Sequence, residues 1–139
     1  MDSLYKDSFK IKTKGFTDII DITDDVILIL KKSEIDDGVL NVFVVGSTAG
    51  ITTIEYEDGA LSDFKEAFDR VAPMDASYSH NQRWGDGNGF SHIRASMLGP
   101  SLSVPFSKNL IELGTWQQIV LVDFDNRPRK RNIIVSIQG

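Results

Sequence analysis

The stretch that decides the fold runs from Val39 to Tyr56 and reads VLNVFVVGSTAGITTIEY. Residues 39–45 form a β-branched run of strand length, which is typical of a strand buried in the centre of a sheet. Small residues at 46–49 interrupt the run, and a second strand is predicted from Gly50 to Tyr56. Strands therefore come in pairs here instead of alternating singly with helices.

A helix is predicted after this pair, from Asp58 to Ala72. Its apolar side chains recur at helical spacing on one face, charged side chains occupy the other, and Pro73 ends it. Towards the N-terminus we predict a strand over residues 4–11 and a helix over 17–33, although the apolar run at 26–30 also fits a strand.

Towards the C-terminus the pattern predicts a short helical turn at 92–98 and strands at 102–106, 118–125 and 131–137. We expect these three strands to form an antiparallel meander. Paired strands with segregated helices favour an α+β class over regular βαβ alternation. The length of 139 residues fits one domain, 1–139.

The composition excludes several kinds of site. The chain has no cysteine, which removes disulfides, thiolate metal sites and a cysteine nucleophile. Its formal charge is −5, which disfavours nucleic acid as a partner because non-specific affinity for nucleic acid needs a positive field. The charged N-terminal residues 1–12 offer no apolar run for a signal peptide or a membrane span. We therefore expect a cytoplasmic protein without a membrane partner.

Both histidines of the chain, His80 and His92, fall in or beside a long polar stretch over residues 73–91. Structureless stretches of this length are uncommon in compact domains unless they are functional or disordered. Two histidines with a neighbouring acid such as Asp86 fit a divalent cation, since imidazole and carboxylate are the ligands left without cysteine. The alternative is a surface histidine and a histidine that packs near a helix start.

Other segments offer weaker signals. Glu55 ends a predicted strand, where a carboxylate acts as a general base or supports a ligand, or is merely solvated. The glycine-rich runs 85–89 and 99–101 present backbone amides to an anion or form ordinary turns. The basic run 127–131 either captures phosphate or protects a sheet edge. Trp116 fits the core or an interface better than a substrate platform.

Taken together, several motifs of this sequence resemble those of the YjbQ family, whose members are sometimes described as secondary thiamine-phosphate synthases. The resemblance covers nearly the whole chain. It is carried by Thr48-Ala49-Gly50-Ile51-Thr52 with Glu55, Tyr78 and His80, Asp86-Gly87-Asn88, Ser91-His92-Ile93-Arg94-Ala95-Ser96-Met97-Leu98-Gly99-Pro100-Ser101, Val104-Pro105, Gly114-Thr115-Trp116-Gln117, Arg129 and Arg131.

This resemblance implies an α+β sandwich of mixed or antiparallel sheets with two main helices, assembled as a homotrimer. It also implies a polar pocket regarded as a metal or phosphate site, with His80 and His92 as metal ligands and Zn or Mg as the metal. A third histidine of the family precedes the Thr-Ala-Gly segment, where this chain has Gly46. Since glycine has no side-chain ligand atom, metal binding is expected to be weaker. Arg94 stands where the family often has lysine.

Three functions compete on these grounds. The first is an enzyme that transfers a pyrimidine methyl group from its diphosphate to a thiazole phosphate, with Glu55, Asp86 and Arg94 as catalytic candidates. The second is a non-catalytic oligomeric binder of a metal ion or a small phosphorylated metabolite. The third is a structural oligomer with a vestigial site. The candidate phosphate-binding residues are Thr48, Asn88, Ser96, Thr115, Gln117 and Arg129.

Overall fold

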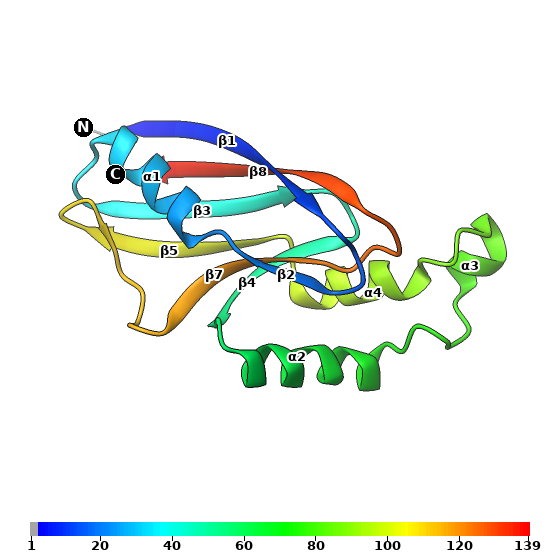
Figure 1. The fold of residues 1–139 in the computed structure, drawn as a ribbon. Coiled ribbons are helices and arrows are strands. Elements are labelled where there is room, and N and C mark those ends of the chain that lie inside the picture. Colours follow the sequence, from blue (N-terminus) through cyan, green and yellow to red (C-terminus); the bar gives the residue numbers. More distant parts are fainter. Residues whose placement is uncertain (1–2) are drawn as a thin grey trace.

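Two antiparallel sheets form the framework of the computed structural model, which describes residues 3–139 (Figure 1). The five-stranded sheet has the order β1-β8-β3-β5-β6, and the three-stranded sheet has the order β2-β7-β4. The five-stranded sheet consists of β1 (Leu4–Thr13), β3 (Gly38–Val45), β5 (Ser101–Ser107), β6 (Leu110–Ile111) and β8 (Arg129–Gln138). The three-stranded sheet consists of β2 (Asp18–Asp21), β4 (Ala49–Glu55) and β7 (Gln117–Asp123).

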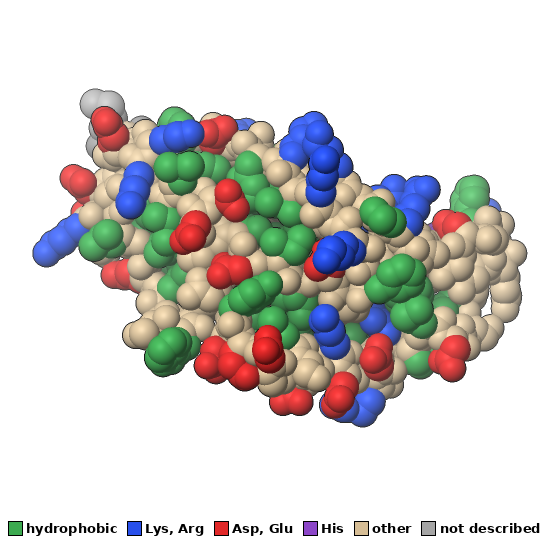
Figure 2. All heavy atoms as spheres, viewed as in Figure 1, with side chains coloured by type: hydrophobic (Ala, Val, Ile, Leu, Met, Phe, Trp, Pro, Cys, Tyr) green, Lys and Arg blue, Asp and Glu red, His purple; other side chains and the backbone are tan. Residues whose placement is uncertain are grey.

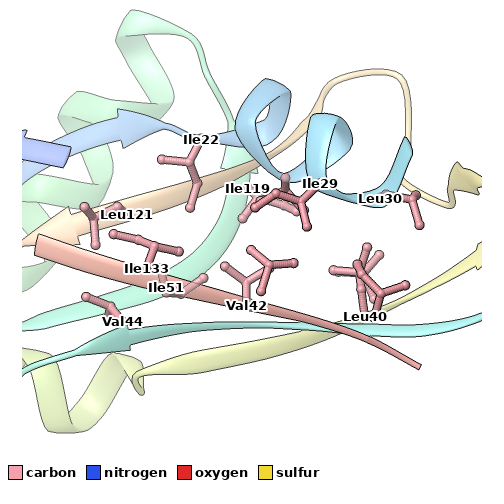
Figure 3. Packing of buried hydrophobic residues seen from close by; sticks show 14 of the residues in the cluster. Ile22, Ile29, Leu30, Leu40, Val42, Val44, Ile51, Ile119, Leu121 and Ile133 are labelled. Atoms are coloured by element: carbon pink, nitrogen blue, oxygen red, sulfur yellow. The ribbon is translucent and has the colours of Figure 1, made fainter. Parts of the chain in front are cut away.

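The core lies between the two sheets because the strands alternate apolar and polar side chains. On β3, Leu40, Val42 and Val44 point inward and are fully buried. They pack with side chains of β8 and with Ile119 and Leu121 of β7, while the helix α1 (Thr23–Ser33) adds its own apolar face (Figure 3). This face of α1 closes the core where the three-stranded sheet does not reach.

Of the remaining helices, α2 (Asp58–Val71) and α4 (Gly89–Leu98) pack against the three-stranded sheet, and α3 (Ser79–Trp84) packs on α4 beyond one end of the sandwich (Figure 1). The Glu57 side chain caps α2 by accepting hydrogen bonds from the backbone amides of Gly59 and Ala60. A second core cluster joins α2 and α4 to the sheet, with the Phe68 and Phe124 rings 4.7 Å apart.

The α+β sandwich is confirmed, with four helices where the resemblance implied two main ones. The expected helix over 17–33 begins only at Thr23, because residues 18–21 form a strand that pairs with β7. The expected long loop contains α3 and the start of α4. Among residues 3–139, no helix is long and apolar enough to cross a membrane.

The predicted C-terminal meander is wrong. β5 pairs with β3 and β6, β7 lies in the other sheet, and β8 lies between β1 and β3. Since β7 and β8 belong to different sheets, the turn between them crosses from one layer to the other. This crossing point, together with the β3–β4 turn and the first turn of α4, surrounds the candidate site described next.

Candidate functional site

A network of buried charges lies where β7 ends and β8 begins. Asp123 and Asp125 are both fully buried, and their spacing of two places them on the same side of the chain. Arg131 binds Asp123 in a bidentate manner, with Nε to Oδ2 at 2.7 Å and Nη2 to Oδ1 at 3.0 Å. The Thr13 hydroxyl donates to the same Asp123 Oδ2 at 2.6 Å. The carboxylate of Asp123 is therefore fully used within the protein.

Asp125 is held by a second set of donors. Arg129 Nε donates to Oδ2 at 2.7 Å, and the hydroxyl of Thr48 donates to the same oxygen at 3.0 Å. The amide of Asn88 and the backbone N–H of Asn126 donate to Oδ1 at 3.3 Å and 2.8 Å. The Thr48 hydroxyl also accepts from Arg131 Nη2, which links the two ion pairs into one network.

These contacts determine the protonation state of Asp125. Burial alone raises the pKa of a carboxyl group because it disfavours the charged form. Here the hydrogen bonds from Arg129, Asn126, Asn88 and Thr48 outweigh burial, so the pKa of Asp125 falls from 3.8 to about 2. Asp125 is therefore an ionised anchor for its arginine at neutral pH, not a group that exchanges protons.

The two histidines meet above this network. His80 comes from α3 and His92 from α4, and their ring centroids are 4.3 Å apart. The His80 Nδ1 atom lies 3.3 Å from Asp86 Oδ1, yet the two atoms do not meet the criteria of a hydrogen bond. Among the residues that the structure describes, 3–139, Nδ1 is buried without a partner. A buried nitrogen without a partner is unusual, so it favours a ligand that supplies one.

His92 is neutral at pH 7. Burial lowers its pKa below the usual 6.5, and repulsion from His80 lowers it further, while Asp125 and Asp86 act in the opposite direction. A neutral imidazole carries one N–H donor and one acceptor nitrogen. His92 is therefore suited to accept a proton or to contact a ligand hydroxyl, and does not supply a positive charge at this pH.

These side chains surround an open pocket of about 500 Å³. Its lining comprises Gly46, Ser47, Thr48, His80, Trp84, Asp86, Asn88, His92, Arg129 and Arg131. Within residues 3–139, the terminal nitrogens of Arg129 and Nη1 of Arg131 donate no hydrogen bond to the protein. The buried Oδ1 of Asn88 likewise has no partner. The pocket thus presents unused donors and unused acceptors to a ligand.

Gly46 explains how the arginine reaches the pocket. Its φ of +136° suits glycine, and a Cβ built there would lie 2.7 Å from Arg131 Nη1. The guanidinium therefore occupies the space beside the position where the family pattern has its third histidine.

Some of the predicted site residues line the pocket, and others lie elsewhere in the structure. Six predicted residues line the pocket: His80, His92, Asp86, Asn88, Thr48 and Arg129. Glu55 lies instead in a hollow at the far end of β4, and Gln117 bonds to Thr53 beside it. Thr115 is exposed in the turn before β7, and Ser96 is exposed on α4. None of these four shares the pocket with the histidines.

Arg94, predicted to stabilise a leaving group, is buried away from the pocket with 1% of its surface exposed. Its Nε donates to the Ala72 carbonyl at 2.9 Å, Nη1 to Thr17 Oγ1 at 3.0 Å and Nη2 to Asp69 Oδ1 at 3.0 Å. Its guanidinium also lies over the Phe90 ring at 5.1 Å. Since its donors serve α2 and the β1–β2 turn, Arg94 holds the helices onto the sandwich.

The sequence analysis missed Asp123 and Asp125 as site residues and considered Arg131 only as part of the basic run 127–131. A signal was present, since Asp123-x-Asp125 is followed closely by Arg129-x-Arg131, and each spacing of two places both charges on one side of a strand. Two acids in or beside an apolar strand need buried partners, and Arg129 and Arg131 follow them within eight residues.

The described residues do not form a complete metal site. Over residues 3–139, no group of three or more His, Asp or Glu side chains converges closely enough to hold an ion. His80 Nδ1 and Asn88 Oδ1 are free to bind one, but a structural or catalytic zinc ion normally takes at least three protein ligands. We therefore derive no chemistry through a metal.

The fold and the pocket together define a class: small antiparallel α+β sandwiches with a pocket of paired histidines and arginines at one end. The family model described as "UPF0047 protein YjbQ-like" matches residues 7–139. The chain belongs to this YjbQ-like UPF0047 family.

Relatives and solved structures agree with this assignment. A UPF0047 protein of Methanothermobacter thermautotrophicus is 40% identical over 136 residues, covering 98% of this chain and 93% of that protein. A YbjQ-like protein of unknown function from Sulfolobus solfataricus P2 superposes with a TM-score of 0.94 at 33% identity, covering 100% and 99%. An uncharacterised YjbQ/UPF0047 protein of Clostridium acetobutylicum superposes with a TM-score of 0.85 at 34% identity, covering 94% of this chain and 98% of that chain.

Proposed function

We propose that the pocket binds a small phosphorylated metabolite, whose phosphate lies against the guanidinium groups of Arg129 and Arg131. The observation that carries this proposal is that these two arginines line the pocket and keep N–H groups that donate to nothing among residues 3–139. A guanidinium presents a planar fork of donors that matches two phosphate oxygens.

The arginines are already fixed before a ligand arrives. Each is held through Nε by a buried aspartate, Asp125 or Asp123. Side chains that are ordered in advance lose little rotamer freedom on binding, so more of the interaction energy becomes affinity. The aspartates also balance the charge of the arginines, so recognition rests on directed N–H donors more than on net charge.

Other side chains that line the pocket suit the rest of the ligand. Within residues 3–139, the Asn88 Oδ1 atom has no partner and accepts hydrogen bonds, and the unpartnered His80 Nδ1 donates or accepts one according to its tautomer, whereas a phosphate has few protons to donate at pH 7. Hydroxyl or amine groups of the same metabolite would provide partners for these atoms. A phosphate ester with a polar body therefore fits the pocket better than inorganic phosphate alone.

The transfer reaction implied by the resemblance is a finer hypothesis for the same pocket. In that reaction the bond between the pyrimidine methylene carbon and the diphosphate oxygen breaks, and the thiazole nitrogen forms the new bond. The departing diphosphate would be stabilised by the donors of Arg129 and Arg131, in place of the buried Arg94. Formation of thiamine phosphate from the two purified substrates is the direct test of this reaction.

Calorimetric titration with pyrophosphate and inorganic phosphate tests the binding proposal. Arg129→Lys keeps the positive charge but removes the fork, so we expect about tenfold weaker binding, or about 1.4 kcal/mol. Arg127→Lys is the matched control, since Arg127 is exposed and does not line the pocket. The proposal fails if the native protein binds neither anion at millimolar concentration, or if the two variants bind equally.

Elemental analysis of the untagged protein separates this proposal from a metal-binding function. Because the ligand set is incomplete, we expect less than stoichiometric metal. Stoichiometric zinc or magnesium in the native protein that disappears in His80→Ala would instead establish a metal site at the histidines.

A further inference from the structure

One apolar side chain lines the pocket of histidines and arginines, the indole of Trp84. Every other lining residue within 3–139 is a glycine or carries a polar or charged side chain. Trp84 is 69% exposed and belongs to neither hydrophobic cluster of the described residues. Tryptophans usually contribute to a fold by burying their large rings. The indole of Trp84 therefore has apolar surface that the fold does not use.

The helix α3 offers no structural reason for a tryptophan. Its six residues read SHNQRW, so Trp84 is its only apolar residue and the helix has no apolar face. Figure 2 shows few hydrophobic side chains at the α3 end of the face in view, in contrast to the sandwich. Trp84 is the last residue of α3, and Gly85 ends the helix with a φ of +73°. This turn leads the chain on to Asp86 and Asn88, which line the same pocket.

A continuous series of contacts leads from the arginines to Trp84. The buried carboxylate that binds Arg129 also accepts from the amide of Asn88. His92 follows Asn88 by one turn of α4, and its ring centroid is 4.3 Å from that of His80. His80 and Trp84 are four residues apart in α3, so their side chains lie on the same face of that helix. The arginine and the indole are the two ends of this series, and the amide and the imidazoles come between them.

We propose that the metabolite is a nucleoside monophosphate, whose base stacks on the indole of Trp84. This inference rests on the proposed function, because it takes the contact of the phosphate with Arg129 and Arg131 as given. The hydroxyl groups of the sugar would donate to Asn88 Oδ1, which has no partner within residues 3–139. Phosphate, sugar and base then follow one another in the same order as the arginines, the polar middle of the pocket and the indole.

The lining of the pocket favours a flat ring over an aliphatic chain. Aromatic rings attract one another in offset stacks, and every nucleobase has a face that can stack. An aliphatic chain would meet no second apolar side chain in the lining. The volume of about 500 Å³ also lies within the range of about 300–1,000 Å³ that is usual for small-molecule sites.

Two ligands that differ in the base test this inference by calorimetry. They are adenosine 5′-monophosphate and ribose 5-phosphate, which has a hydroxyl group in place of the base. Stacking on an aromatic side chain strengthens binding by about tenfold or more per base, so we expect this ratio between the two affinities. Trp84→Ala should abolish the ratio without changing the affinity for ribose 5-phosphate or pyrophosphate, and Trp84→Phe should retain part of it. Trp116→Ala is the matched control, since Trp116 is 72% exposed but lines a different hollow.

Fluorescence gives a second readout that reports on the indole itself. The chain has two tryptophans, so Trp116→Phe leaves Trp84 as the only one. Adenosine 5′-monophosphate should quench the emission of this variant, and ribose 5-phosphate should not, because only a stacked base contacts the indole.

The outcomes separate this inference from the proposed function. If pyrophosphate binds but adenosine 5′-monophosphate binds no more tightly than ribose 5-phosphate, the inference is overturned and the proposed function stands. The same conclusion follows if Trp84→Ala binds adenosine 5′-monophosphate as tightly as the native protein does. If the native protein binds neither pyrophosphate nor either sugar phosphate, both are wrong.

Discussion

Replacing Asp125 by asparagine tests the idea that a permanently ionised aspartate anchors the pocket. In the native protein this carboxylate accepts from Arg129 and Thr48 on one oxygen and from Asn88 and Asn126 on the other. The side chain of asparagine has one acceptor oxygen and one NH₂ group, which donates. In either orientation of the amide, the NH₂ group faces two of the four donors, and these two lose their acceptor.

The expected cost at pH 7 follows from these contacts. Removing one partner of a buried charge pair typically costs 3–5 kcal/mol, and hydrogen bonds to charged groups contribute about 1.5–3 kcal/mol each. We therefore expect Asp125→Asn to lower the free energy of unfolding by about 3 kcal/mol. Asp86→Asn is the control, since Asp86 also lines the pocket but is half exposed.

The pH dependence gives a second, independent signature. The pKa of Asp125 in the folded protein is about 2, against 3.8 for an ordinary aspartate, and this difference corresponds to about 2 kcal/mol. Because the folded-state pKa is depressed, the unfolded chain takes up the proton first as the pH falls. This stabilisation is present above about pH 4 and is lost as the pH falls towards 2.

Urea unfolding of the native protein and of Asp125→Asn between pH 5 and pH 2.5 measures this contribution. The native protein is expected to lose about 1.6 kcal/mol more than the variant over this interval, so the difference between the two stabilities narrows in acid. If the stabilities of both proteins fall in parallel, Asp125 is not the ionised anchor described here, and the account of the pocket is refuted.

Three further predictions concern neighbouring features. Gly46→Ala should lower the free energy of unfolding by about 1–3 kcal/mol in thermal or urea unfolding, because of its positive φ and the contact with the arginine, whereas Ser47→Ala should change it little. His92 should titrate below 6.5 by NMR, and His80→Ala should raise that pKa by removing the repulsion; an unchanged pKa would contradict the proximity of the rings. The native stability should also fall as the pH drops below 6.5, because the unfolded chain protonates this histidine first. Arg94→Met should lower the free energy of unfolding by about 1–3 kcal/mol in urea, because it leaves buried acceptors at Ala72 and Thr17 without a donor, and it should not alter pyrophosphate affinity. A loss of affinity as large as that of Arg129→Lys would place Arg94 in the binding site.

Local patterns in the sequence were sufficient to predict several helices and strands and part of the candidate site. The helical spacing of residues 58–72 predicted α2 to within one residue, and the β-branched run 39–45 predicted β3. His80 and His92 could be grouped because they are close in sequence, and the α3–α4 segment does bring them together. These features depend on side-chain periodicity and short spacings, which are properties of a local stretch of chain.

Strand partners and the completed pocket were decided only by the tertiary structure. β8 inserts between β1 and β3 although more than 80 residues separate it from β3 along the chain, and this places Arg129 and Arg131 beside Thr48. Glu55 and Arg94 match the same family motifs as the histidines, yet the sandwich places them elsewhere. Periodicity tells which face of a strand is apolar but not which strand lies beside it, because pairing is selected by packing of the whole core. For the same reason, the charges of Asp123 and Asp125 gained their role only when folding buried them next to the arginines.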